Sequence, residues 1–171
     1  MPASPFLSRL FGPPAQGILV VCTANICRSP MAEAVLRAEL VRCRVHHRYR
    51  VDSAGTHATQ PGHRADARAV RICRQWGVDL GRSRARQVRE GDFQRHDYIL
   101  AVDDKCFQWL RAAAAENSAA RISRLGAWAP QGDLGDIPDP YFGNAASFEL
   151  VFDMLHRAIP GFVAHLLQNS R

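Results

Sequence analysis

Lysine is almost absent from this chain: of its 22 basic residues, Lys105 is the one lysine and all the others are arginine. Arginine suits phosphate binding because its planar guanidinium donates two parallel N–H bonds. The net charge of +6 is spread along the chain. The densest basic stretches, 42–50 and 82–86, lack the interleaved aromatic pattern of RNA-binding modules. We therefore expect no nucleic-acid partner.

A paired cysteine motif is missing as well. The 5 cysteines are an odd number, and none of them forms a CxxC pair. Together with the absence of a secretory signal, this argues against a framework of structural disulfides. The histidines lack the spacing of zinc ligands. We expect no metal and no cofactor.

Long apolar runs are also lacking. No stretch matches the roughly 18 apolar residues of a membrane-spanning helix, and the first residues lack the apolar centre of a signal peptide. The sequence therefore predicts a cytoplasmic protein without a membrane span. Residues 1–16 carry several prolines, which favours a partly flexible N-terminal extension. With 47% hydrophobic residues, the remainder, 17–171, fits one folded domain.

Short apolar segments alternate with helical patterns along that domain. The predicted strands are 18–21, 49–53, 98–102 and 121–125. The predicted helices are 29–41, 66–75, 104–116 and 147–168, with a kink or split expected in the last one at Pro160-Gly161. This alternation predicts an α/β fold, a single domain with a doubly wound sheet of about four parallel strands flanked by helices. Such sheets bind ligands at the carboxyl ends of their strands.

The segment 21–30 carries the clearest chemical signal. It reads Val-Cys-Thr-Ala-Asn-Ile-Cys-Arg-Ser-Pro and joins the first predicted strand to the first predicted helix. Ser29 is expected to cap that helix and Pro30 to occupy its first position. The N–H groups of such a loop, together with the positive end of the helix, form an anion site of phosphate size. The same environment, with Arg28 beside it, favours a thiolate at Cys22.

A plainer interpretation of the same residues remains open. The spacing C-x5-R is a loose pattern by itself. Cys22 would then be a small buried residue at the end of a strand, Arg28 a surface residue of the helix, and Ser29 only a helix cap.

At these residues the chain resembles the low-molecular-weight protein tyrosine phosphatases of bacterial type, whose signature is a valine followed by C-x5-R-S-P. The resemblance extends over about residues 17–167 and includes the segments 31–34, 51–56, 85–87, 97–100 and 139–143. It implies hydrolysis of phosphotyrosine through a phosphocysteine intermediate. It also implies the same α/β fold, with a phosphate-binding loop after the first strand.

The resemblance assigns roles to three catalytic residues. Cys22 would attack phosphorus, and Arg28 would hold the transferred group. Asp139 would protonate the leaving oxygen and then activate water. Two alternatives concern the acid: Asp136 is a rival carboxylate, and the run 138–140 is also ordinary turn chemistry.

The resemblance also implies a set of substrate-binding residues. Backbone N–H groups of the loop would bind the phosphoryl oxygens. Ser29 would donate to the thiolate, Asn25 would hold the loop in shape, and Tyr141 would stack on an aromatic substrate. Asparagine also tolerates left-handed backbone angles, which suits a tight loop. The full set is Thr23, Ala24, Asn25, Ile26, Cys27, Ser29 and Tyr141.

Cys27 has two interpretations. A second loop cysteine in this family can form a reversible disulfide with the nucleophile, which would protect Cys22 from over-oxidation. The alternative is a small buried residue.

Two positions depart from the family pattern. Thr23-Ala24 replaces a bulky apolar residue and a glycine, so the pocket rim is expected to be smaller and more polar. Ala24 also requires an ordinary backbone angle. Trp76 stands where many members have a histidine near the loop serine, so support for Ser29 is expected from elsewhere.

Three alternative functions share some of these features. Thioredoxin-linked arsenate reductases need two further cysteines, and only Cys106 lies in the relevant region. Protein arginine phosphatases carry a threonine where this chain has Ile26. A phosphopeptide-binding module without activity does not need Cys22, Arg28 and Asp139 together. The resemblance instead predicts a phosphotyrosine protein as partner, with a bacterial tyrosine kinase of exopolysaccharide assembly as the specific candidate.

Overall fold

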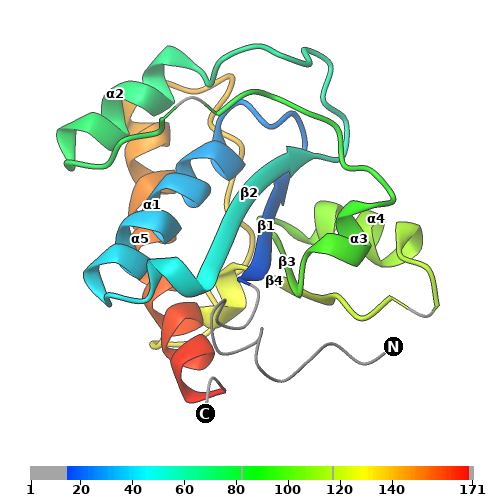
Figure 1. Cartoon of the computed structure of the whole chain (residues 1–171). Helices are drawn as coiled ribbons and strands as arrows, with labels where there is room; N and C mark the ends of the chain where they lie inside the picture. Colours follow the sequence, from blue (N-terminus) through cyan, green and yellow to red (C-terminus); the bar gives the residue numbers. More distant parts are fainter. Residues whose placement is uncertain (1–14, 82, 117, 170–171) are drawn as a thin grey trace.

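The strands lie at the centre of the molecule (Figure 1). The computed structural model describes residues 15–81, 83–116 and 118–169. The described residues form one parallel sheet of four strands in the order β2-β1-β3-β4. The strands are β1 (Gln16–Cys22), β2 (Tyr49–Gly55), β3 (Tyr98–Ala101) and β4 (Arg121–Arg124). The predicted fold class and the four predicted strands are confirmed.

The predicted N-terminal extension falls almost wholly outside the described residues. Of residues 1–16, only Ala15 and Gln16 are described. Gln16 already pairs with Tyr49 as the first residue of β1. The boundary between extension and domain therefore stays a prediction from the sequence.

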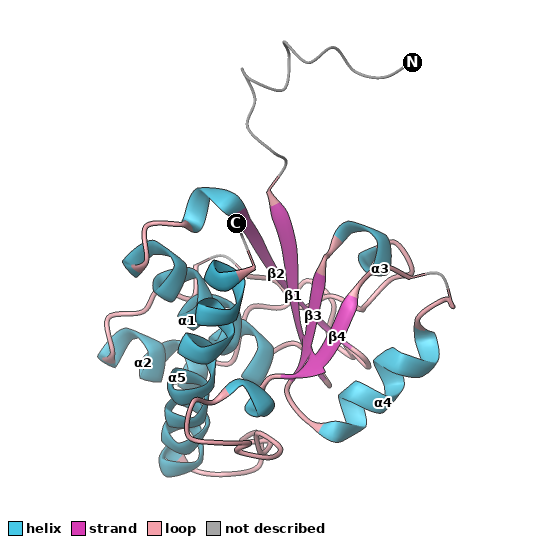
Figure 2. Cartoon of the chain, turned by 90° about the horizontal axis from the view of Figure 1, so that it is seen from below, coloured by secondary structure: helices cyan, strands magenta, loops and turns pink. Residues whose placement is uncertain are grey.

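Helices cover both faces of the sheet (Figure 2). One face carries α1 (Arg28–Arg42), α2 (Ala67–Gln75) and α5 (Ala145–Gln168). The other carries α3 (Asp92–Arg95) and α4 (Asp104–Ala113). Short 3-10 turns occupy His46–Arg48 and Gly126–Trp128. The four long helices match the predicted ones, whereas α3 was not expected because four residues are too few for a periodic pattern.

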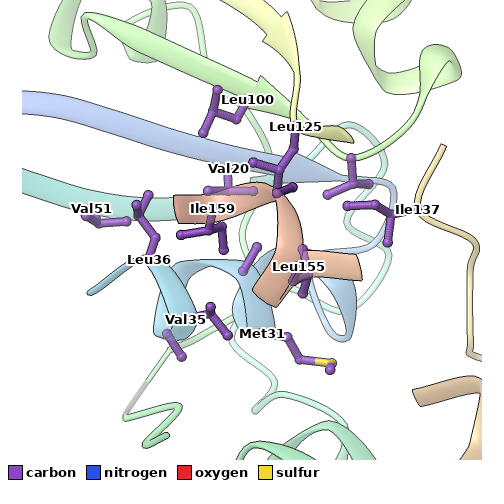
Figure 3. Packing of buried hydrophobic residues seen from close by; sticks show 14 of the residues in the cluster. Val20, Met31, Val35, Leu36, Val51, Leu100, Leu125, Ile137, Leu155 and Ile159 are labelled. Atoms are coloured by element: carbon purple, nitrogen blue, oxygen red, sulfur yellow. The ribbon is translucent and has the colours of Figure 1, made fainter. Parts of the chain in front are cut away.

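Strand β1 is buried on both of its faces. Ile18 and Val20 belong to the larger hydrophobic cluster, and Leu19 and Val21 to the smaller one on the opposite face; none of the four is exposed. Figure 3 shows the larger cluster around Val20. Burial of each such side chain contributes about 1.5–3 kcal/mol. The carboxyl end of β1, where Cys22 lies, is thereby held from both sides.

Helix α5 is a core helix. Among the described residues it is the one helix that is long and apolar enough, by length and composition, to cross a membrane. One side, including Phe148, Leu155 and Phe162, is fully buried in the larger cluster. The opposite side carries exposed charges, among them Asp153 and Arg157 at 3.6 Å. A helix with one buried and one charged face is typical of a globular core.

The expected split at Pro160 does not occur. Helix α5 runs unbroken from Ala145 to Gln168, although Pro160 cannot donate an intrahelical hydrogen bond. At Gly161, an added Cβ would collide with the carbonyl oxygen of Trp128. The absence of a side chain at Gly161 thus lets α5 pack directly against the turn Gly126–Trp128.

Candidate active site

Cys22 lies at the start of a tight loop, residues 22–29, which we call the cysteine loop. Its Sγ is 3.0 Å from the Oγ of Ser29 and accepts a hydrogen bond from the N–H of Asn25 at 3.2 Å. The residue is only 2% exposed. The Ser29 hydroxyl and the Asn25 N–H therefore both lie against the sulfur, on the inner side of the loop.

Ser29 does not cap the first helix, contrary to the expectation from sequence. Helix α1 begins at Arg28, one residue earlier, and its N-cap position is Cys27, without a side-chain cap. The Ser29 hydroxyl instead faces Cys22 and also lies 3.4 Å from the carbonyl of Ala54. Pro30 is the third residue of α1 and not the first, as was expected. It is tolerated there because the N–H groups of a first helical turn have no intrahelical acceptor.

Asn25 holds the cysteine loop in shape. Its φ is 58°, in the left-handed region that asparagine tolerates, as predicted. Its Nδ2 donates to the Oγ of Ser29 at 2.9 Å and to the Oγ of Ser53 at 3.0 Å, and its Oδ1 accepts from the N–H of Arg86 at 2.9 Å. Ala24, in contrast, keeps a negative φ, as its methyl group requires.

The support behind Ser29 comes from β2 and α1, and not from Trp76. Trp76 is 64% exposed at the end of α2 and stacks on Phe152 at 5.5 Å, away from Ser29. The expectation that Ser29 is supported from elsewhere is confirmed. Ser53 continues the chain of hydrogen bonds from Asn25 by donating to buried Glu33 at 2.5 Å. Burial raises the pKa of Glu33, against the lowering effects of the Ser53 bond and of a nearby arginine.

Arg28 is held by two carboxylates. Its Nη1 donates to Asp103 at 2.6 Å and to the carbonyl of Ile137 at 3.1 Å, and its Nη2 donates to Asp139 at 3.1 Å. Burial disfavours the charged guanidinium, but Cys22, Asp139 and Asp103 outweigh that effect and raise the pKa of Arg28. The guanidinium is therefore a fixed cation beside the Cys22 sulfur.

Asp103 is a site residue that the sequence analysis missed. It caps α4 by accepting from the N–H of Cys106 at 2.7 Å. Burial would raise its pKa, but the bonds from Cys106 and the charge of Arg28 prevail and lower it. The signal was its place directly after β3, since ligand-binding residues of parallel sheets gather at the carboxyl ends of neighbouring strands.

Asp139 lies on a second loop, residues 137–143, which we call the aspartate loop. Its Oδ2 accepts from Arg28 and its Oδ1 from the N–H of Tyr141 at 3.1 Å. The rival carboxylate, Asp136, instead accepts from the N–H of Asp104 at 2.9 Å, at the start of α4. Asp139 therefore faces the cysteine loop, and Asp136 does not.

The two loops enclose one cavity of about 180 Å³. The predicted site residues Cys22, Thr23, Ala24, Ile26, Cys27, Arg28, Asp139 and Tyr141 line it, whereas Asn25 and Ser29 lie behind it. Phe142, Thr59 and Gln60 also line the cavity and were not predicted as site residues. Phe142 is 98% exposed. The cavity thus has a polar base and an aromatic rim.

Three other cysteines are protonated thiols at neutral pH. Burial raises the pKa values of Cys27, Cys73 and Cys106 to about 12, with Asp66 adding to the effect at Cys27. In the part of the chain that the structure describes, no group of three or more histidine, cysteine or acidic side chains could hold a metal ion.

An α/β sheet with a cysteine-containing anion loop after its first strand, faced by an arginine and an aspartate, defines a class of phosphate-ester hydrolases. The family model of the low molecular weight phosphotyrosine protein phosphatases matches residues 17–171. The chain belongs to this family, and it is an enzyme that hydrolyses phosphotyrosine.

Sequence relatives support this assignment across most of the chain. The low molecular weight phosphotyrosine protein phosphatase of Gallus gallus is 37% identical over 150 residues, which cover 86% of this chain and 94% of that protein. The low molecular weight protein-tyrosine-phosphatase of Streptomyces coelicolor is 39% identical over 151 residues, covering 86% and 91%.

Solved structures show the same architecture. A protein tyrosine phosphatase from Entamoeba histolytica with Hepes in its active site superposes with a TM-score of 0.87 at 30% identity, covering 92% of this chain and all of that one. Wzb of Vibrio vulnificus in complex with benzylphosphonate gives 0.77 at 28% identity, covering 88% and 99%.

Proposed function

We propose that this phosphatase works through a phosphocysteine intermediate formed on Cys22. The observation that carries the proposal is that Cys22, Arg28 and Asp139 line one cavity. The Cys22 thiolate attacks phosphorus in line, and the bond from phosphorus to the tyrosine oxygen breaks. Arg28 and the loop N–H groups stabilise the charge that develops on the transferred group.

Asp139 serves both proton transfers. In the first step its carboxylic acid protonates the leaving phenolate oxygen, and in the second its carboxylate takes a proton from the water that attacks phosphocysteine. Ser29 donates to the Cys22 sulfur and helps it leave in the second step. Asn25 keeps the Ser29 hydroxyl in place, which is supported by their 2.9 Å contact.

The aromatic rim supports phosphotyrosine as the substrate. A phenyl ring spans the distance from the rim to Cys22, whereas the side chain of phosphoserine is too short to present its phosphate there. Ile26, Tyr141 and Phe142 offer apolar surface to that ring. Comparable turnover of phosphoserine and phosphotyrosine peptides would contradict this selection. Phosphoarginine and arsenate are the assays for the alternative activities.

The partner and the cellular location are further proposals. The resemblance to bacterial members supports a phosphotyrosine protein as partner, a tyrosine kinase of exopolysaccharide assembly being the specific candidate. The proposed mechanism requires a free thiol at Cys22, which supports a reducing, cytoplasmic environment.

Cys27 protects the nucleophile in this proposal. Peroxide oxidises the Cys22 thiolate to a sulfenic acid and is reduced to water; the Cys27 thiol then attacks that sulfur, a disulfide forms and a second water leaves. Both cysteines line the same cavity. We expect Cys27→Ser to lose activity irreversibly under peroxide while the parent recovers with thiol. Equal recovery of both proteins would contradict this role.

The proposed mechanism is tested by trapping the intermediate. We expect alkaline denaturation during turnover of a radiolabelled phosphotyrosine peptide to yield labelled parent enzyme and unlabelled Cys22→Ala enzyme, which has no side-chain nucleophile. Asp139→Asn is expected to lower kcat/KM by about 10²–10³-fold, whereas Asp136→Asn, the matched control, retains it. Retained activity in Cys22→Ala would overturn the mechanism.

A further inference from the structure

Arg68 lies outside the catalytic set but joins the two loops that form the cavity. It is the second residue of α2, and its side chain is 37% exposed. No sequence pattern distinguishes it from the other arginines of the chain. Its contacts reach Asp66 on one side and the aspartate loop on the other.

Asp66 fixes the orientation of the Arg68 side chain. The Asp66 carboxylate caps α2 by accepting the N–H of Arg68 at 2.8 Å, and the same carboxylate accepts from the Arg68 Nε at 3.0 Å and Nη2 at 2.8 Å. The guanidinium carbon also lies 4.6 Å from the ring centre of buried Phe148. A paired, stacked guanidinium has little freedom left to move.

The remaining N–H groups of Arg68 bind backbone carbonyls of the aspartate loop. Nη2 donates to the carbonyl of Tyr141 at 3.0 Å, and Nη1 to that of Gly143 at 3.2 Å. The N–H of the same Tyr141 donates to Asp139 at 3.1 Å. One residue, Tyr141, therefore links the Arg68 guanidinium to the Asp139 carboxylate.

The N-cap residue of α2, Asp66, is bonded to the cysteine loop. The N–H of Asp66 donates to the carbonyl of Ile26 at 2.8 Å. Ile26 lies within the cysteine loop and lines the cavity. Asp66 and Arg68 thus connect the loop that binds phosphate to the loop that carries Asp139, independently of Arg28.

We propose that Arg68 is a positioning residue that sets the distance of the Asp139 carboxyl from the leaving oxygen by holding the Tyr141 and Gly143 carbonyls. The inference rests on the proposed role of Asp139 as general acid. Because Asp139 is half exposed, few other contacts restrain it. The planar guanidinium of Arg68 donates four hydrogen bonds at once, and a lysine ammonium cannot reproduce that geometry.

The test measures kcat/KM on a series of aryl phosphates whose leaving groups differ in basicity. Acid catalysis matters most for the most basic leaving group. We expect Arg68→Met to lower kcat/KM for phenyl phosphate about tenfold more than for 2,4-dinitrophenyl phosphate, a fraction of the full acid contribution. Asp139→Asn should show a larger effect of the same kind. In the double variant with Arg68→Met and Asp139→Asn, the loss of Arg68 should not widen the difference in kcat/KM between the two substrates any further.

Controls separate positioning from charge and from folding. Arg71→Met removes an exposed arginine of the same helix and should leave all rates unchanged. Arg68→Lys keeps the positive charge but lacks the planar guanidinium. We therefore expect this variant, like Arg68→Met, to lose more kcat/KM on phenyl phosphate than on 2,4-dinitrophenyl phosphate. Alkylation of Cys22 by iodoacetate, with and without phosphate, reports on the cysteine loop and should match the parent.

The possible outcomes are distinct. An equal loss on every substrate, full recovery in Arg68→Lys, or altered Cys22 alkylation would overturn the positioning role while leaving the proposed function intact. If Asp139→Asn itself showed no dependence on the leaving group, the general-acid proposal would fail first, and this inference with it.

Discussion

The cysteine loop and the aspartate loop meet at one cavity but are built in opposite ways. In the cysteine loop Asn25, Arg28 and Ser29 are at most 4% exposed, and each has several polar partners. In the aspartate loop the side chains of Asp139 and Phe142 are 54% and 98% exposed. The backbone carbonyls of that loop accept hydrogen bonds from Arg28 near its start and from an arginine of α2 at its far end.

This difference separates two tasks. The phosphate group is the same in every substrate, so donors fixed before binding stabilise its charge without reorganisation. The rest of the substrate varies, and an exposed rim adapts to it without disturbing the donors. Anchoring the aspartate loop by its backbone also lets its rim side chains change while Asp139 keeps its place. Substitutions in the two loops should therefore have different kinds of effect.

The largest effect is expected at Arg28. Arg28→Lys keeps the charge but cannot bridge Asp103 and Asp139 while also holding a phosphoryl group, so kcat/KM on a phosphotyrosine peptide should fall about 10³-fold. Steady-state kinetics measure it. Arg37→Lys, an exposed helix arginine paired with Glu33 at 2.7 Å, is the control and should change activity little. A loss below tenfold at Arg28 would contradict the fixed-cation interpretation.

A smaller effect is expected at Asn25. Asn25→Ala loses three side-chain bonds and keeps a left-handed backbone angle, so the free energy of unfolding should fall by about 3 kcal/mol. Asn25→Gly loses the same bonds but accepts the angle, and should recover about 1 kcal/mol of that. Denaturant unfolding measures both. Equal stability of the two variants would mean that the backbone angle of 58° carries no cost.

The smallest effect is expected at the rim. Phe142→Ala should raise KM for a phosphotyrosine peptide about threefold by removing apolar contact, and should leave p-nitrophenyl phosphate kinetics unchanged. The midpoint of thermal unfolding should stay the same because Phe142 is almost fully exposed. A clear drop in thermal stability would show that the rim is part of the folded framework and would weaken the contrast between the loops.

The sequence predicts the sheet well because β1 and β3 are buried on both faces and read as short apolar runs. It predicts the cysteine loop well for a similar reason: all its parts lie within one segment, residues 21–30. Even there, the expected helix cap at Ser29 is wrong, because the Ser29 hydroxyl faces the Cys22 sulfur instead of a backbone N–H of α1.

The rest of the site depends on pairs far apart in the chain. Arg28 contacts Asp103, which is 75 residues away in the sequence, and Asp139, which is 111 residues away. No periodic sequence pattern indicates such contacts. Arg68 could not be distinguished from the many other arginines for the same reason.

The direction of β1 has a practical consequence. Its first residue, Gln16, lies at the amino end of the parallel strands, and its last, Cys22, lies at their carboxyl end. Seven residues of strand span about 20 Å. A peptide tag, a fluorophore or a solid support attached ahead of Gln16 therefore joins the domain at the end of the sheet opposite the cavity. Immobilised enzyme tethered in this way should present its active site to solution, which suits capture of phosphotyrosine proteins on a surface.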